Sequence, residues 1–160
     1  MNNDPAWANW LVLLAQVHGP AIGWAVLFGG WYFLSRDNDR RERRKEVRAL
    51  LNEIRNSILS VEDQAYEYYN THAQASQKLA RKIKRDLKHL AGMITTLKNL
   101  NPNFDLDNLF NQYRQNLTGH DFESAARTER SPNDALFAEI SESAVQLTSA
   151  METMFQKSYS

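Results

Sequence analysis

Apolar residues recur through the middle of the chain at the spacing of helix faces rather than of strands. Between residues 47 and 68 they lie alternately four and three positions apart, which is the seam of a heptad repeat. This seam consists of Val47, Leu51, Ile54, Ile58, Val61, Ala65 and Tyr68. A second apolar stripe consists of Leu79, Ile83, Leu87, Leu90, Ile94 and Leu97. Because no stretch alternates as a strand would, the sequence predicts an all-α fold.

The two stripes predict helices over residues 36–69 and 73–100. Asn70 and Thr71 lie between them and are residue types that cap a new helix, which favours an antiparallel hairpin. No Gly or Pro enforces the turn, so one very long helix is the alternative. The seam has two alternative partners as well, since it can pack within one chain or against neighbouring copies. Asn101-Pro102 ends the second helix, because the residue before proline resists the α region.

Two further helices are predicted, over residues 105–118 and 132–157. Gly119 closes the first of them. Ser131-Pro132 resembles a helix start, with serine as the cap and proline at the first helical position. Asp105 and Asp107 flank a helix start and are interpreted as caps rather than metal ligands. Residues 36–160 therefore form a predicted helical domain, a bundle of about four helices with a coiled-coil-like seam.

The 31 residues from Pro5 to Ser35 contain no Asp, Glu, Lys or Arg. A soluble domain does not need so long an uncharged opening, whereas a bilayer span does, because charge in hydrocarbon costs several kcal/mol. Residues 1–35 are therefore predicted to be an N-terminal membrane anchor with a transmembrane helix. A cleaved signal peptide fits less well, because the opening residues MNND carry no positive charge.

The anchor is longer than one span needs, since 31 helical residues extend about 46 Å against a hydrocarbon core of about 30 Å. His18-Gly19-Pro20 provides a break at 18–20, so residues 5–18 either cross the membrane or lie on it. Asn9 and Gln16 share one helix face and, with His18, are the candidate residues for a pore or a helix–helix contact. The alternative is that Asn9 and Gln16 lie at headgroup depth and that His18 satisfies a freed carbonyl.

Basic residues crowd the C-terminal side of the anchor. They are Arg36, Arg40, Arg41, Arg43, Arg44, Lys45 and Arg48. The positive-inside rule then places the N-terminus outside and the C-terminal domain in the cytoplasm. These side chains are expected to bind anionic headgroups, at about 1 kcal/mol each.

Charge is balanced overall but segregated along the chain. Residues 36–100 hold 15 basic and 9 acidic residues, a net of +6, whereas residues 101–160 hold 4 and 9, a net of −5. The face opposite the second stripe carries Lys78, Arg81, Lys82, Lys84, Arg85 and Lys88. This face is a candidate patch for a protein partner or RNA, although it lacks aromatic residues to stack on bases. The alternatives are a solvated face or contact with the acidic half.

Few residues suggest catalysis. The chain has no cysteine, which excludes thiol chemistry and cysteine zinc sites, and no cofactor is expected. Arg114 and His120 are separated by five residues, which matches the R-x(4–6)-H pattern of the HEPN superfamily of helical proteins. The resemblance implies a ribonuclease with His120 as acid or base and Arg114 stabilising the phosphate. Gln115 departs from the Asn, Asp or His of many such nucleases. The structural alternative pairs Arg114 with Asp121 or Glu123.

The overall layout, an anchor followed by a basic helix and a helical bundle, resembles the small membrane accessory protein of type VI-B CRISPR loci. That resemblance implies an oligomeric, pore-like effector of antiviral defence with a defence-system protein as partner. We therefore expect a homo-oligomer that associates through the membrane helix and the heptad seam and perturbs the bilayer. A membrane-tethered HEPN-type ribonuclease and a non-catalytic membrane scaffold or tether are the alternatives.

Overall fold

The computed structural model describes residues 40–72 and 76–159. The predicted anchor, with its break at 18–20 and the residues Asn9, Gln16, His18 and Arg36, lies outside the described residues. Among the helices that are described, none combines the length and the apolar character that a bilayer crossing requires.

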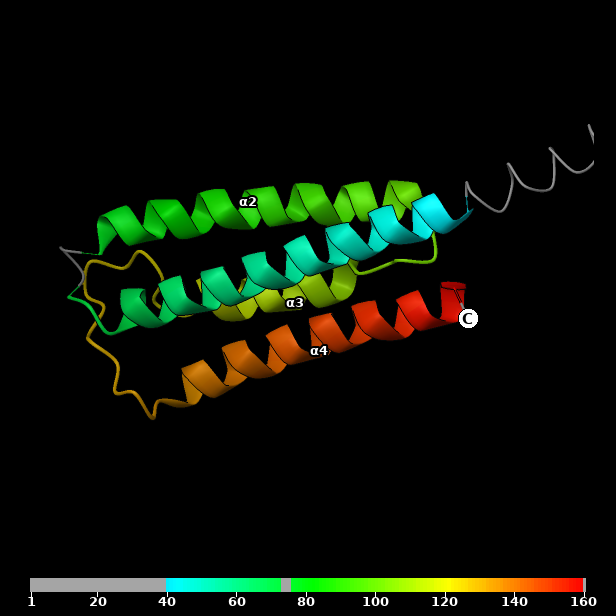
Figure 1. Cartoon of the computed structure of the whole chain (residues 1–160). Helices are drawn as coiled ribbons and strands as arrows, with labels where there is room; N and C mark the ends of the chain where they lie inside the picture. The colour runs from blue at the N-terminus through cyan, green and yellow to red at the C-terminus, as the bar shows by residue number, and fades with distance from the viewer. Residues whose placement is uncertain (1–39, 73–75, 160) are drawn as a thin grey trace, which may run out of the picture. The chain divides into compact units, whose positions relative to one another are not determined.

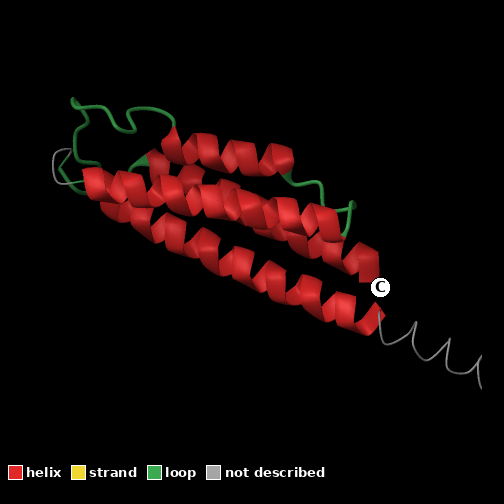
Figure 2. Cartoon of the chain, turned by 90° about the horizontal axis from the view of Figure 1, so that it is seen from above, coloured by secondary structure: helices red, strands yellow, loops and turns green. Residues whose placement is uncertain are grey.

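Four helices make up the described part of the chain, which confirms the all-α prediction. The first helix covers residues 40–69 and is followed by α2 (Gln77–Leu100), α3 (Asp107–Thr118) and α4 (Ala135–Tyr159). The chain divides into two compact units, Met1–Arg44 and Lys45–Ser160. In the second unit the helices run alternately up and down as a bundle. Helices α2 and α4 lie along opposite edges in Figure 1, and the first helix and α3 lie along opposite edges in Figure 2.

The heptad seam is the interior of this bundle. All seven of its side chains, from Val47 to Tyr68, are at most 4% exposed, and Ile54, Val61 and Ala65 are fully buried. In the second stripe Ile83, Leu87, Leu90, Ile94 and Leu97 are buried and join the same core. The whole seam therefore packs against other helices of the same chain. A neighbouring copy cannot contact it unless the bundle opens.

Buried tyrosines connect the first helix to α3 across the core. The Tyr69 hydroxyl donates a hydrogen bond to the Leu117 carbonyl at 2.9 Å, and the Tyr113 hydroxyl donates to the Ile58 carbonyl at 3.3 Å. Tyr69 and Tyr113 are fully buried, and burial raises the pKa of both hydroxyls. These bonds keep the polar ends of two large side chains satisfied inside an apolar interior.

The first helix and α2 form the predicted hairpin, but the residues between them have other roles than those expected. The helix α2 begins at Gln77, not at residue 73. Ser76, which precedes it in the capping position, makes no side-chain capping bond. Thr71 does not cap α2 either, because its hydroxyl donates back to the Glu67 carbonyl at 2.7 Å. Thr71 thus completes the end of the first helix.

The starts of α3 and α4 also lie later than predicted. Helix α3 begins at Asp107, and the carboxylates of Asp105 and Asp107 both bind Lys98 Nζ, at 3.1 and 2.6 Å. Helix α4 begins at Ala135 rather than at residue 132, because Asp134, not Ser131, caps it by accepting a 3.0 Å hydrogen bond from the Leu136 amide. The ends at Asn101 and Gly119 agree with the prediction.

Adjacent residues of the first helix provide a matched test of this core. Ile58 is 1% exposed and Leu59 is 55% exposed. We expect Ile58→Ala to lower the free energy of unfolding by about 2–5 kcal/mol, because it leaves a cavity, and Leu59→Ala to change it by less than about 0.5 kcal/mol. Denaturant unfolding followed by circular dichroism measures both values, and equal losses would contradict the described orientation of the helix.

Candidate functional site

The linker of residues 119–134, between α3 and α4, is the most irregular part of the described bundle. It begins at Gly119, whose amide donates to the Gln115 carbonyl at 2.7 Å. A Cβ at this position would lie 2.5 Å from the same oxygen, so only glycine fits. Two non-glycine residues in the linker, His120 and Glu123, adopt positive φ values of 51° and 60°. Such backbone geometry costs free energy and persists only where surrounding contacts hold it.

Arg127 holds the linker on the end of the first helix. Its guanidinium is buried and donates to the carbonyls of Tyr69 (3.2 Å) and Thr71 (2.6 Å) and to Ser76 Oγ (2.7 Å). The two carbonyls lie where the helix ends, and a helix C-terminus attracts positive charge. No carboxylate pairs with Arg127 among residues 40–72 and 76–159, so helix-end carbonyls and aromatic rings surround this cation.

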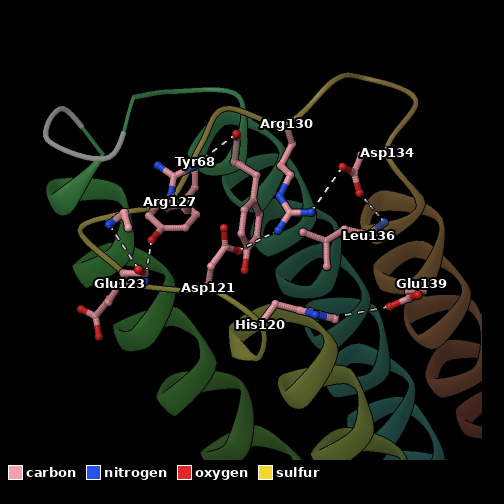
Figure 3. A network of polar contacts seen from close by, with 12 residues as sticks. Tyr68, His120, Asp121, Glu123, Arg127, Arg130, Asp134, Leu136 and Glu139 are labelled. Atoms are coloured by element: carbon pink, nitrogen blue, oxygen red, sulfur yellow. Dashed lines mark hydrogen bonds and ion pairs between the residues drawn. The ribbon is translucent and has the colours of Figure 1, made fainter.

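The rings of Tyr68 and Tyr69 complete the Arg127 site. The guanidinium carbon lies 4.3 Å from the centroid of the Tyr68 ring and 5.7 Å from that of Tyr69, so cation–π attraction adds to the hydrogen bonds. The Tyr68 hydroxyl accepts a 2.8 Å hydrogen bond from the amide of Glu123, one of the strained residues. Figure 3 shows this stack at the top of the first helix.

Arg130 forms a second bridge, between the two ends of the linker. Its guanidinium binds Asp121 at 3.0 Å and Asp134 at 3.4 Å, and its amide donates to the Tyr69 carbonyl at 2.9 Å. The hydrogen bond from the Leu136 amide, followed by the bond from Arg130, lowers the pKa of Asp134. With Arg127, this network (Figure 3) joins the linker and the starts of α2 and α4 to the first helix. The charged groups of this network therefore hold parts of the chain together.

Arg114 and His120, the predicted catalytic pair, both have exposed side chains. His120 Nε2 faces Glu139 Oε2 of α4 at 3.7 Å, as Figure 3 shows, and both side chains are about half exposed. The expected pairing of Arg114 with Asp121 or Glu123 is wrong. Arg130 binds Asp121, and Lys84 of α2 binds Glu123 at 2.7 Å. The catalytic role of Arg114 and His120 stays a prediction.

The predicted membrane-surface residues are helical and exposed from residue 40 onward, which covers Arg40, Arg41, Arg43, Arg44, Lys45 and Arg48. Arg48 has a further contact inside the bundle unit, because it binds Glu152 of α4 at 2.7 Å and lies 5.0 Å from the Phe155 ring centroid. The start of the first helix therefore combines exposed basic side chains with one cation that fixes α4.

The candidate partner or RNA patch is a row along α2. Its members Lys78, Arg81, Lys82, Arg85 and Lys88 are all exposed. Lys78, Arg81, Lys82 and Arg85 line a groove that Glu67, Thr71 and Leu79 complete. Arg85 binds the adjacent Asp86 at 3.1 Å, while the other four make no ion pair in the described part of the chain. Lys84, on the same helix, meets the acidic half through Glu123.

A different surface lies between the first helix and α4. Tyr66 and Phe137 stack with ring centroids 4.6 Å apart, and Glu62 hydrogen-bonds to Ser141 one turn further along. Burial raises the pKa of the Glu62 carboxyl above its ordinary value, Asp63 raises it further, and the Ser141 bond partly opposes the shift. A carboxyl in this position sits beside apolar side chains without a basic partner among the described residues.

Among the described residues, no group of three His, Asp or Glu side chains could hold a metal ion. Comparisons with known proteins give no match to a protein-family profile, to a curated protein or to a solved structure.

Arg127→Met tests the structural role of the buried guanidinium. We expect a loss of about 3 kcal/mol in the free energy of unfolding, because the helix-end carbonyls lose their donors while remaining buried. Arg127→Lys should recover only part of the loss, since one ammonium cannot reproduce the planar fork. Arg114→Met, at an exposed position of α3, is the matched control and should change the value by less than about 0.5 kcal/mol. Equal effects of Arg127→Met and Arg114→Met would contradict the assignment.

Glu62→Gln should stabilise the bundle at neutral pH by less than about 1 kcal/mol, because the native chain no longer holds a partly desolvated carboxylate. The pKa of Glu62 is higher in the folded chain than in the unfolded chain, so the folded chain binds the proton at a higher pH. Folding therefore becomes more favourable as the pH falls through the range between these two pKa values. The advantage of the variant should therefore disappear on acidification. Thermal unfolding from pH 7 to pH 4 measures it, with the exposed Glu53→Gln as control.

Proposed function

We propose that this chain is a membrane-anchored, oligomeric effector of bacterial antiviral defence. Its N-terminal segment crosses the inner membrane and perturbs permeability, and its helical bundle is a cytoplasmic docking or sensing part. The observation that carries the proposal is the partition at residues 35 and 36, where 31 uncharged residues meet a dense basic cluster. Such a boundary is typical of a membrane span followed by its cytoplasmic flank.

The bundle supports a binding role better than a catalytic one. The most connected polar network, around Arg127 and Arg130, uses its donors to hold the linker and helix ends. His120 and Arg114 are exposed at the surface rather than enclosed. An enclosed site is where electrostatic stabilisation of a reacting phosphate is strong. The assignment to antiviral defence rests on the architectural resemblance to the membrane accessory protein of type VI-B CRISPR loci.

The polar residues of the anchor are the candidates for a water-filled path. We expect the full-length protein to depolarise cells when its expression is induced. Asn9→Leu with Gln16→Leu should abolish the depolarisation, because the two polar side chains that share one helix face are then lost. A potential-sensitive dye reports the effect, and the amount of protein in the membrane fraction serves as the control. Unchanged depolarisation would remove these residues from the proposed path.

The same assay separates the alternatives. Arg114→Ala and His120→Ala should depolarise as the wild type does, and loss of the effect in both would favour a membrane-tethered ribonuclease. A wild-type chain that leaves the membrane potential intact would favour a scaffold. An intact chain that remains in the supernatant after detergent-free lysis and ultracentrifugation would overturn the anchoring itself.

A further inference from the structure

Copies that contact each other in the cytoplasm need a surface other than the heptad seam, since the seam is buried in the core of each bundle. Four large apolar side chains are counted as exposed in the described part of the chain: Leu59 (55%), Tyr66 (43%), Leu100 (37%) and Val145 (59%). Three of the four belong to the first helix and α4, the two helices that the Tyr66–Phe137 stack holds together. Exposed apolar side chains that gather in one place are typical of an interaction surface.

The register of the two helices places these residues together. Tyr66 meets Phe137 and, one turn further, Glu62 meets Ser141. Because the helices are antiparallel, the next turn brings Leu59 level with the segment that contains Val145. Glu62, Asp63 and Glu142 lie among them, and Glu142 is exposed. We call this surface the acidic-apolar face: Leu59, Glu62, Tyr66, Phe137, Glu142 and Val145.

The basic row of α2 has the opposite charge and lies on the α2 side of the first helix, in a groove that Glu67 and Thr71 complete. Figure 1 places α2 and α4 on opposite edges, with the first helix and α3 between them. The row and the acidic-apolar face are therefore separate surfaces, one on the α2 side and one on the α4 side of the first helix. A copy that presents its row to the acidic-apolar face of a neighbour leaves its own acidic-apolar face available for a third copy. Such contacts are head-to-tail rather than self-complementary.

One end of the row also lies level with the acidic-apolar face along the bundle. Gln64 Nε2 donates to Asp86 Oδ2 at 3.0 Å, which sets Gln64 of the first helix level with Asp86 of α2. The two helices are antiparallel, so each step from Gln64 back toward Leu59 matches one step from Asp86 toward the C-terminus of α2. Arg85 and Lys88 are therefore level with the acidic-apolar face. Arg85 and Lys88 of one copy can therefore meet the acidic-apolar face of a neighbour in the same membrane without a shift along the helix axes.

We propose that the basic row of α2 in one copy docks on the acidic-apolar face of the next copy, and that this contact assembles the oligomer. Lysine and arginine side chains suit such a face because their aliphatic stems cover apolar groups while their charged ends reach carboxylates. An arginine of the row can also lie over the Tyr66 ring. The inference rests on the proposed function, since it needs copies that share one membrane and one orientation.

The apolar part of the contact is tested on the full-length protein in detergent. Wild-type mass, measured by light scattering, should be a multiple of the chain mass. Leu59→Gln with Val145→Gln should reduce it to one chain at the same concentration. Leu100→Gln, at the exposed apolar residue outside the acidic-apolar face, should leave it unchanged. Thermal unfolding verifies that the three proteins fold alike. An unchanged mass in the double variant would overturn the inference.

Charge reversal tests the pairing of the two surfaces. The register sets Lys88 level with Glu142, and both side chains are exposed. Lys88→Glu and Glu142→Lys should each raise the dissociation constant at least about tenfold, because they place like charges together, and the combined variant should restore assembly. Failure of the combination to restore assembly would overturn the proposed pairing.

Two outcomes separate this inference from the proposed function. A wild-type chain that sediments with membranes but has the mass of one chain in detergent would overturn the inference and leave the anchoring intact. A fluorescent 20-nucleotide single-stranded RNA provides the other comparison. If Lys88→Glu abolishes RNA binding and leaves the mass unchanged, the row binds RNA and the copy-to-copy contact is overturned.

Discussion

The fold depends on one buried cation at the end of its first helix. Arg127 replaces water around the carbonyls of Tyr69 and Thr71 and binds Ser76 at the start of α2. Burying a guanidinium without a carboxylate costs free energy, and the helix end together with the Tyr68 ring offsets this cost. Because Arg127 belongs to the linker, the same contact fixes the direction from which the chain enters α4.

The core was predictable because its cause is local periodicity. Every seam residue from Val47 to Tyr68 is buried, since a helix that buries one face must repeat its apolar residues at that spacing. The helix ends at Asn101 and Gly119 were predictable for steric reasons, which act within a few residues. The helix starts were not predictable, because a polar side chain near a helix start has several backbone donors and acceptors within reach. Thr71 bonds backward to Glu67, and Asp134 rather than Ser131 caps α4.

The ion pairs of the linker could not be predicted, because they depend on how the chain reverses. Asp121 and Glu123 lie close to Arg114 in sequence, yet they bind Arg130 and Lys84. Nothing in the sequence around Arg127 marks it as buried, and its acceptors come from a segment more than fifty residues earlier. The basic row of α2 was predictable as a surface, since a helix whose opposite face is apolar must expose it. Its register against the first helix required the Gln64–Asp86 bond.

The basic and acidic residues that are separated along the sequence also gather on different surfaces of the folded bundle. If the basic and acidic halves neutralised each other within one chain, the row of α2 would meet the carboxylates of α4. The described ion pairs instead form mainly at the ends of the bundle, through Arg48 with Glu152, Lys84 with Glu123 and Lys98 with Asp107. The remaining cations of α2 and the carboxylates beside Leu59 lie on two different sides of the first helix. A particle with separated charges lowers its electrostatic energy by aligning with neighbours. Confinement to one membrane would favour such alignment, because every copy would arrive in the same orientation.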